Sequence, residues 1–141
     1  SHPEPGCPFA PRCTRVRPVC THLALVFISH DLELVAGLSD RILVMYAGLI
    51  LETGPVRQVL DSPRSPYTQA LLSSRLVWGQ RWTTHPLTLI PGNPPDPSHP
   101  EPGCPFAPRC TRVRPVCTQQ IPPLTATGEH QFRCFNPEVP L

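Results

Sequence analysis

The chain has 141 residues, enough for one ordinary domain, yet 22 of them are proline. The prolines crowd residues 3–18 and 86–123, where regular helices and central strands are hard to sustain. A formal net charge of +2 is too small to indicate a nucleic-acid-binding protein. We therefore expect no nucleic-acid partner, and we place the packable domain at residues 22–76.

Neither an export signal nor a membrane span is visible in the sequence. The longest apolar run, Leu23–Ile28, is far too short to cross a bilayer, and no basic-then-apolar leader precedes it. We therefore expect a cytosolic chain, in which the seven cysteines are reduced or metal-bound rather than paired in disulfides.

A repeated block opens the chain. Residues 98–118 repeat residues 1–21 without a single change, and unrelated sequence separates the two copies. Repeat architectures have several inexact copies at shorter periods, so this pattern favours a recent duplication or an assembly accident. The first copy has no fourth cysteine downstream in register, so we predict no complete metal site for its three cysteines, Cys7, Cys13 and Cys20.

The first half of the packable domain predicts a strand, a helix and a hairpin. Leu23–Ser29 is almost continuously apolar, which is typical of a central parallel strand that is buried on both faces. An apolar stripe predicts a helix over Asp31–Leu38, capped by Asp31 or Ser29. Arg41–Tyr46 and Leu49–Thr53 are predicted strands that turn at Ala47-Gly48.

Two short helices and a long irregular segment complete the prediction. Gly54-Pro55 opens a helix over Val56–Leu60, and a second helix is expected over Tyr67–Ser74. Residues 77–97 are a linker, which Trp78 and Trp82 would pack onto the helices, and Pro91–Pro102 shows no helix or strand signal. The fold class is therefore half of an α/β layer followed by a Pro/Cys-rich, mostly irregular tail over 98–141.

Four cysteines of the tail form a candidate metal site with the spacing C-x5-C-x6-C-x16-C: Cys104, Cys110, Cys117 and Cys134. Structural zinc usually uses a close C-x2–4-C pair, whereas an iron–sulfur cluster accepts thiolates from a loop that wraps around it. Spacing alone does not favour zinc over an iron–sulfur cluster, and four cysteines without a metal are a third interpretation. His130 is the natural substitute ligand if the metal is zinc.

Three stretches carry a resemblance to a known family. FISHDLELVAGLSDRILVMYAGLILETGP resembles the region around the switch histidine of ABC-transporter ATPases. VRQVLDSPRSPYTQALLSS is similar to the oligopeptide/dipeptide importer branch, although Ser65 replaces the first residue of its His-Pro-Tyr motif. IPGNPPDPSHPEPGCPFAPRC resembles the C-terminal extension of that branch.

The resemblance implies the C-terminal half of an ATP-binding subunit that couples ATP hydrolysis to peptide uptake. It implies that His30 is the switch histidine, contacting the γ-phosphate of Mg-ATP and orienting the attacking water. It also implies a 4Fe-4S cluster on the four tail cysteines, and moves our expectation from zinc to iron. The partners would be a second ATP-binding subunit and permease subunits, at the inner face of a bacterial cell membrane.

The motifs that would bind and cleave ATP are missing. No lysine occurs among the 12 basic residues, so the chain cannot contain a P-loop, which needs a lysine after its glycines. Leu32 follows Asp31 where a catalytic glutamate would stand, so Asp31 is better interpreted as a helix cap. We therefore expect His30 to be vestigial and the chain alone to be inactive. A stand-alone metal-binding module and a nonfunctional rearranged fragment stay open as alternatives.

Overall fold

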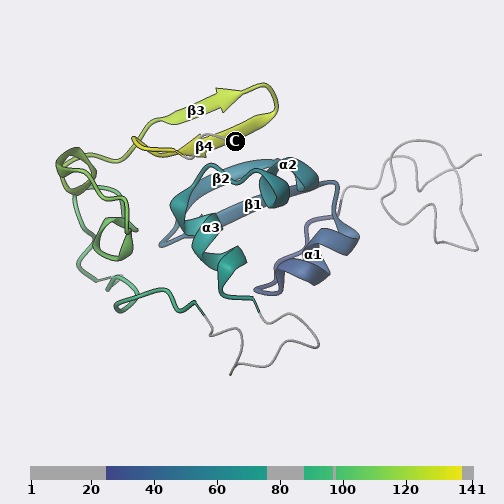
Figure 1. Cartoon of the computed structure of the whole chain (residues 1–141), viewed down its shortest axis with the longest axis horizontal. Coiled ribbons are helices and arrows are strands. Elements are labelled where there is room, and N and C mark those ends of the chain that lie inside the picture. The colour runs from purple at the N-terminus through teal and green to yellow at the C-terminus, as the bar shows by residue number, and fades with distance from the viewer. Residues whose placement is uncertain (1–24, 76–87, 97, 138–141) are drawn as a thin grey trace, which may run out of the picture.

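A computed structural model of the chain describes residues 25–75, 88–96 and 98–137 (Figure 1). Predictions for the first cysteine block and for Trp78 and Trp82 lie outside these residues. None of the described helices is both long and apolar enough to span a membrane. The helices and strands are α1 (Leu32–Leu38), β1 (Arg41–Tyr46), β2 (Leu49–Pro55), α2 (Val56–Asp61), α3 (Pro66–Ser73), β3 (Leu124–Thr127) and β4 (His130–Arg133).

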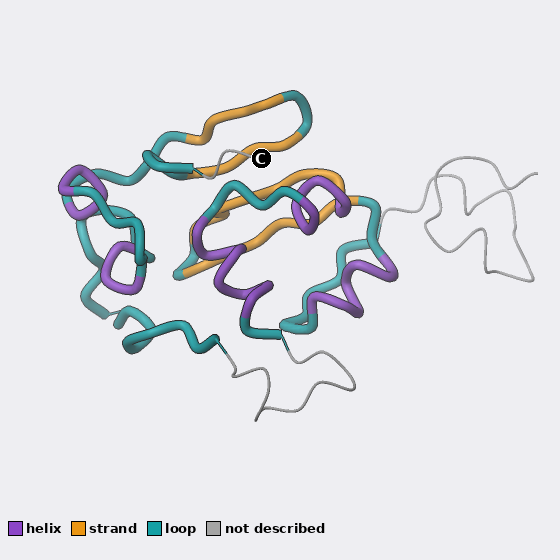
Figure 2. The backbone as a smooth tube through the Cα atoms, viewed as in Figure 1, coloured by secondary structure: helices purple, strands orange, loops and turns teal. Residues whose placement is uncertain are grey.

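The strands form one antiparallel sheet in the order β1-β2-β4-β3. The predicted hairpin is confirmed as β1 and β2, and the predicted helices are confirmed with ends that shift by one residue. The tail was predicted to be irregular, and this was wrong for β3 and β4. Figures 1 and 2 show this second hairpin beside β2, where β4 pairs Phe132 with Glu52 and Gln131 with Thr53.

The β1–β2 turn and a bulge set the shape of the first hairpin. Ala47 and Gly48 have φ angles of 47° and 79°, as a two-residue turn between right-twisted strands requires. The register then shifts between Val44 and Met45, so Leu51 is an extra residue on β2. The bulge breaks the usual alternation, and the consecutive residues Leu51 and Glu52 are both fully buried, at 1% and 0% exposure.

All three helices pack on one face of β1. Ile42 and Val44 point inward from β1 and form a core with Val59 of α2. Val35 of α1 and Leu71 of α3 pack against the same core, while Leu43 and Met45 on the other face of β1 are exposed. Asp31 caps α1 as predicted, because its Oδ1 accepts the Leu34 amide at 3.1 Å.

The predicted central strand at Leu23–Ser29 is not a strand in the part that the structure describes, residues 25–29. Val26 and Ile28 are 87% and 92% exposed instead of buried. The physical reason is that a strand needs a hydrogen-bonded neighbour, and the sheet of the described residues begins at β1.

Candidate metal centre

The second copy of the repeated block supplies a tight loop that carries three cysteines. Two short 3-10 helices, Ala107–Arg109 and Pro115–Thr118, give the loop its shape. The Cys104 amide donates to the Cys117 carbonyl at 2.7 Å and closes the loop. Gly103 permits this closure, because a Cβ there would lie 2.2 Å from the Cys117 carbonyl oxygen.

Aromatic and arginine contacts hold the loop on the β1–β2 hairpin. Phe106 is 4% exposed and packs against the rings of Tyr46 and Tyr67, with centroid distances of 5.5 Å and 5.1 Å. Arg109 donates from Nη1 to the Tyr46 hydroxyl at 3.1 Å and from Nε to the Pro91 carbonyl at 2.7 Å. Arg109 thus fastens residues 90 and 91 and the cysteine loop to the hairpin.

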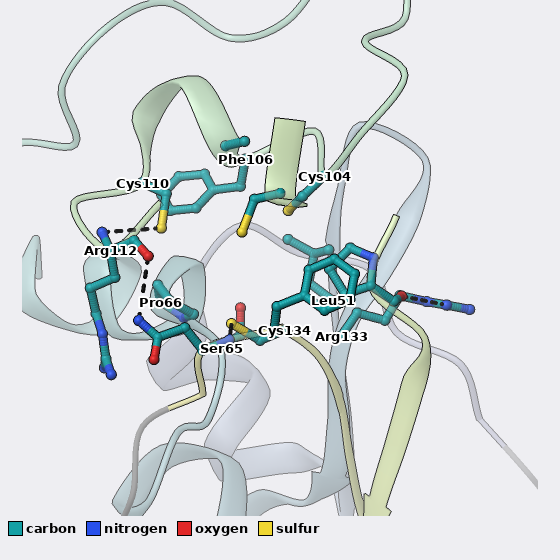
Figure 3. Close-up of a pocket in the computed structure, with 14 residues that line it drawn as sticks. Leu51, Ser65, Pro66, Cys104, Phe106, Cys110, Arg112, Arg133 and Cys134 are labelled. Carbon is teal, nitrogen blue, oxygen red and sulfur yellow. Dashed lines mark hydrogen bonds between the residues drawn. The ribbon is translucent and has the colours of Figure 1, made fainter. Parts of the chain in front are cut away.

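The structure brings all four predicted cysteines to one pocket, which Leu51, Ser65 and Phe106 also line. Figure 3 shows Cys104 and Cys110 on one side of this pocket and Cys134, just beyond β4, on the other. Residues separated by the whole Cys110–Cys134 segment are therefore gathered around one space. We call it the cysteine pocket, defined by its four cysteines, Cys104, Cys110, Cys117 and Cys134.

Backbone amides point at the sulfur atoms of the cysteine pocket. The Arg112 and Arg114 amides donate to Cys110 Sγ and Cys117 Sγ, each at 3.4 Å, and the Asn136 amide donates to Cys134 Sγ at 3.3 Å. Amide donors stabilise a thiolate more than a neutral thiol. At residues 112 and 114 these donors belong to the main chain and not to the guanidinium groups.

Burial raises the pKa of the Cys104, Cys110 and Cys134 thiols above the ordinary value. Neighbouring cysteines raise these pKa values further, and the amide hydrogen bonds lower them. The sulfurs are therefore close enough to repel one another as thiolates. A bound cationic centre would reverse this preference, because metal ligation requires deprotonated sulfur.

As they stand in the described residues, no three His, Cys, Asp or Glu side chains are arranged to hold a metal ion. His130, the predicted substitute ligand for zinc, does not line the cysteine pocket. Its Nε2 lies 2.7 Å from Oε1 of Glu52, within hydrogen-bond distance. The structure therefore groups the four cysteines and leaves the histidine out.

Two further residues matter to the functional assignment. His30 lies exposed in a bend before α1 and is not part of the cysteine pocket, so its role in ATP chemistry stays a prediction.

Sequence reasoning missed Glu52, which is completely buried between β4 and the loop before α3. A single acidic residue in a predicted strand normally indicates a solvent-facing position, so only the fold reveals it.

The sequence of this chain is similar to one transporter family and to several curated proteins. The family described as "Oligopeptide/dipeptide transporter, C-terminal region" matches residues 1–20 and 51–117. A relative from Brucella melitensis, named as a peptide import ATP-binding protein, is 42% identical over 118 residues, which cover 84% of this chain and 35% of the relative. A Brucella ovis protein of the same description is 39% identical over 119 residues, covering 81% and 35%. The chain thus spans about a third of the length of the curated relatives it matches.

Proposed function

This chain belongs to the family of oligopeptide/dipeptide transporter C-terminal regions, and we propose that it is the C-terminal part of the ATP-binding subunit of a peptide-type ABC importer. The relatives are named for peptide import and ATP binding, and their matches cover 84% and 81% of this chain. In the complete subunit, ATP binding and hydrolysis would drive a membrane permease to take up a peptide.

The ATP-dependent part of this function needs residues that the 141-residue chain does not supply. With no lysine available, a P-loop cannot form, and His30 has no phosphate to contact within this chain. Mg-ATP, a second ATP-binding subunit and the permease therefore belong to the complete importer, whose ATP-binding subunit would lie at the cytoplasmic face of the membrane. The chain alone is expected to show no ATP turnover and at most very weak nucleotide binding.

The function that this chain can perform by itself is metal binding at the cysteine pocket. We propose a 4Fe-4S cluster, and the observation that carries it is the convergence of four thiols, three of which accept a backbone amide. Structural zinc usually uses a close C-x2–4-C pair, and the spacing C-x5-C-x6-C-x16-C contains none. When bound, a cluster supplies one-electron redox chemistry or a rigid link between the loop and β4.

Anaerobic purification followed by iron, acid-labile sulfide and zinc analysis tests this assignment. We expect about four iron and four sulfide per chain, because a cluster of this type is held by four thiolates. One zinc per chain without sulfide would refute the cluster. Substitution of Cys110 by serine should lower the iron content, and substitution of Cys13, the same position of the first block, is the matched control, since that block is proposed to lack a complete site.

A stand-alone metal-binding module is the second candidate. One observation favours it, because every cysteine of the pocket and every contact that fixes the loop lie within this chain. The two candidates differ in what they need. A stand-alone module keeps its cluster and has no nucleotide dependence, whereas an importer subunit lengthened by the missing ATPase half should gain ATP turnover that requires His30.

A further inference from the structure

Glu52 is the one acidic residue among the described residues that is fully buried, with 0% exposure. Its Oε1 accepts the Arg64 amide at 2.6 Å, and its Oε2 accepts the Ser65 amide at 3.1 Å. Burying a carboxylate is costly unless hydrogen bonds compensate it. Glu52 therefore binds the loop before α3 tightly, and the same loop lines the cysteine pocket through Ser65 and Pro66.

The third hydrogen bond of Glu52 comes from the tail. His130, only 5% exposed, places Nε2 at 2.7 Å from Oε1 of Glu52. An ionised carboxylate only accepts hydrogen bonds, so Nε2 must carry the hydrogen. Gly54 leaves room for this ring, since a Cβ there would lie 3.3 Å from His130 Cδ2. One carboxylate thus joins β2, the loop before α3 and β4.

Cys134 depends on this joint more than the other cysteines do. It directly follows β4, and β4 pairs with β2 at Gln131 and Phe132, beside the Glu52–His130 bond. On its other side Cys134 is held by Asn136, whose side chain bonds to Arg114 and to the Arg112 carbonyl. The other three cysteines sit in a loop with its own closure and its own aromatic anchor, Phe106. Loosening β4 should therefore affect Cys134 more than the other three cysteines.

We propose that Glu52 and His130 form a buried positioning pair that sets Cys134 against the other three thiols of the cysteine pocket. The pair also ties the pocket to the loop that begins α3, so the occupancy of the pocket and the order of this loop are coupled. The metal-binding consequence rests on the proposed function. The positioning of Cys134 does not, and it can be measured on the reduced, metal-free chain.

The test measures the alkylation rate of each cysteine by peptide mass spectrometry in folded, reduced, metal-free chain. Glu52→Gln replaces one acceptor oxygen of the carboxylate by an NH2 group, which donates hydrogen bonds. This buried NH2 group would then face another donor, such as the Ser65 amide. We expect Cys134 to react about tenfold faster, equal to about 1.4 kcal/mol, while Cys104 and Cys117 change less than about twofold. His130→Gln should act in the same direction, and the double variant should add little to either single variant.

Glu129→Gln is the matched control, because it makes the same chemical change in the same hairpin on a side chain that is 73% exposed and pairs with Arg41 at 3.7 Å, and an exposed ion pair contributes little to stability. His99→Gln is the corresponding control for histidine, at 86% exposure. Neither control should alter Cys134. An unchanged Cys134 rate in Glu52→Gln, or an equal rise of all four rates in both Glu52→Gln and His130→Gln, would overturn the proposal, since the latter indicates general unfolding.

A second measurement separates this proposal from the cluster itself. After anaerobic reconstitution, Glu52→Gln should lose iron faster than the unaltered chain in the presence of a chelator, and Glu129→Gln should not. If the unaltered chain takes up no iron and sulfide, the proposed cluster fails while the alkylation result still decides the role of Glu52. If iron is bound and retained equally in all three chains, the coupling between the pair and the pocket is refuted.

Discussion

Replacing Phe106 by alanine tests how the cysteine loop is fastened to the hairpin. Phe106 is 4% exposed, and its ring meets Tyr46 edge-on at 86° and Tyr67 at 56°. Burial of a phenylalanine contributes about 1.5–3 kcal/mol, and each ring pair adds about 0.5–1.5 kcal/mol. The sum agrees with the loss of about 3–5 kcal/mol that a buried Phe→Ala change typically causes.

Hydrogen exchange with mass spectrometry measures this loss where it should occur. We expect peptides that cover Cys104–Thr118 and extend beyond the repeat, which distinguishes them from the first copy, to open at least about a hundredfold more often in Phe106→Ala, because about 2.7 kcal/mol corresponds to that ratio. The peptide that covers α2 should keep its protection. Phe9→Ala is the matched control, since Phe9 stands at the same place in an identical block. Equal effects of the two variants, or no effect of either, would refute the assigned packing.

Three other substitutions probe the local geometry. Gly103→Ala should lower the free energy of unfolding by more than about 2 kcal/mol and reduce iron uptake, because the new Cβ meets the Cys117 carbonyl; Gly6→Ala, in the first copy, should do neither. Ala47→Gly should raise the free energy of unfolding by about 0.5–1 kcal/mol in urea denaturation, because Ala47 adopts a left-handed φ of 47°. Arg109→Lys should lower the free energy of unfolding by about 1–3 kcal/mol, because an ammonium group cannot reproduce three hydrogen bonds from one planar guanidinium. An unchanged denaturation midpoint would contradict the role of Arg109 in fastening the loop.

Local patterns in the sequence were enough to predict the β1–β2 hairpin and its helices. Alternating burial in β1 and the turn at Ala47-Gly48 are encoded within a few residues, so they do not depend on the rest of the fold. The run at Leu23–Ser29 shows the limit of the same reasoning. Its composition predicts a buried strand, but burial also requires a neighbouring strand, and Val26 and Ile28 are exposed without one.

The β3–β4 hairpin was missed although a signal exists. Gly128, with φ of 62°, lies between Leu124–Thr127 and His130–Arg133 in a turn typical of hairpins. The surrounding prolines concealed these short strands. The pairing of β4 with β2 joins residues 78 positions apart through Glu52 and His130, and the bulge that turns Glu52 inward has no local signature.

The structure brings the four cysteines to one pocket, and His130 does not line it. The cysteines were singled out by their spacing, and the resemblance to a known extension decided only which metal to expect. His130 lies four positions before Cys134, which spans roughly 13 Å along an extended strand, and its Nε2 contacts Glu52 instead. The spacing in the sequence therefore singled out the thiols that meet, and only the sheet showed that His130 lies outside their pocket.

Iron and sulfide content of two matched triple-serine variants tests the central assignment most directly. Each variant removes three cysteines from an identical stretch of sequence, one from the second copy (Cys104, Cys110 and Cys117) and one from the first (Cys7, Cys13 and Cys20). We predict that the first-copy variant keeps the iron and sulfide of the unaltered chain and that the second-copy variant loses both. Equal losses in the two variants, or zinc without sulfide in the unaltered chain, would contradict a four-iron cluster at the cysteine pocket.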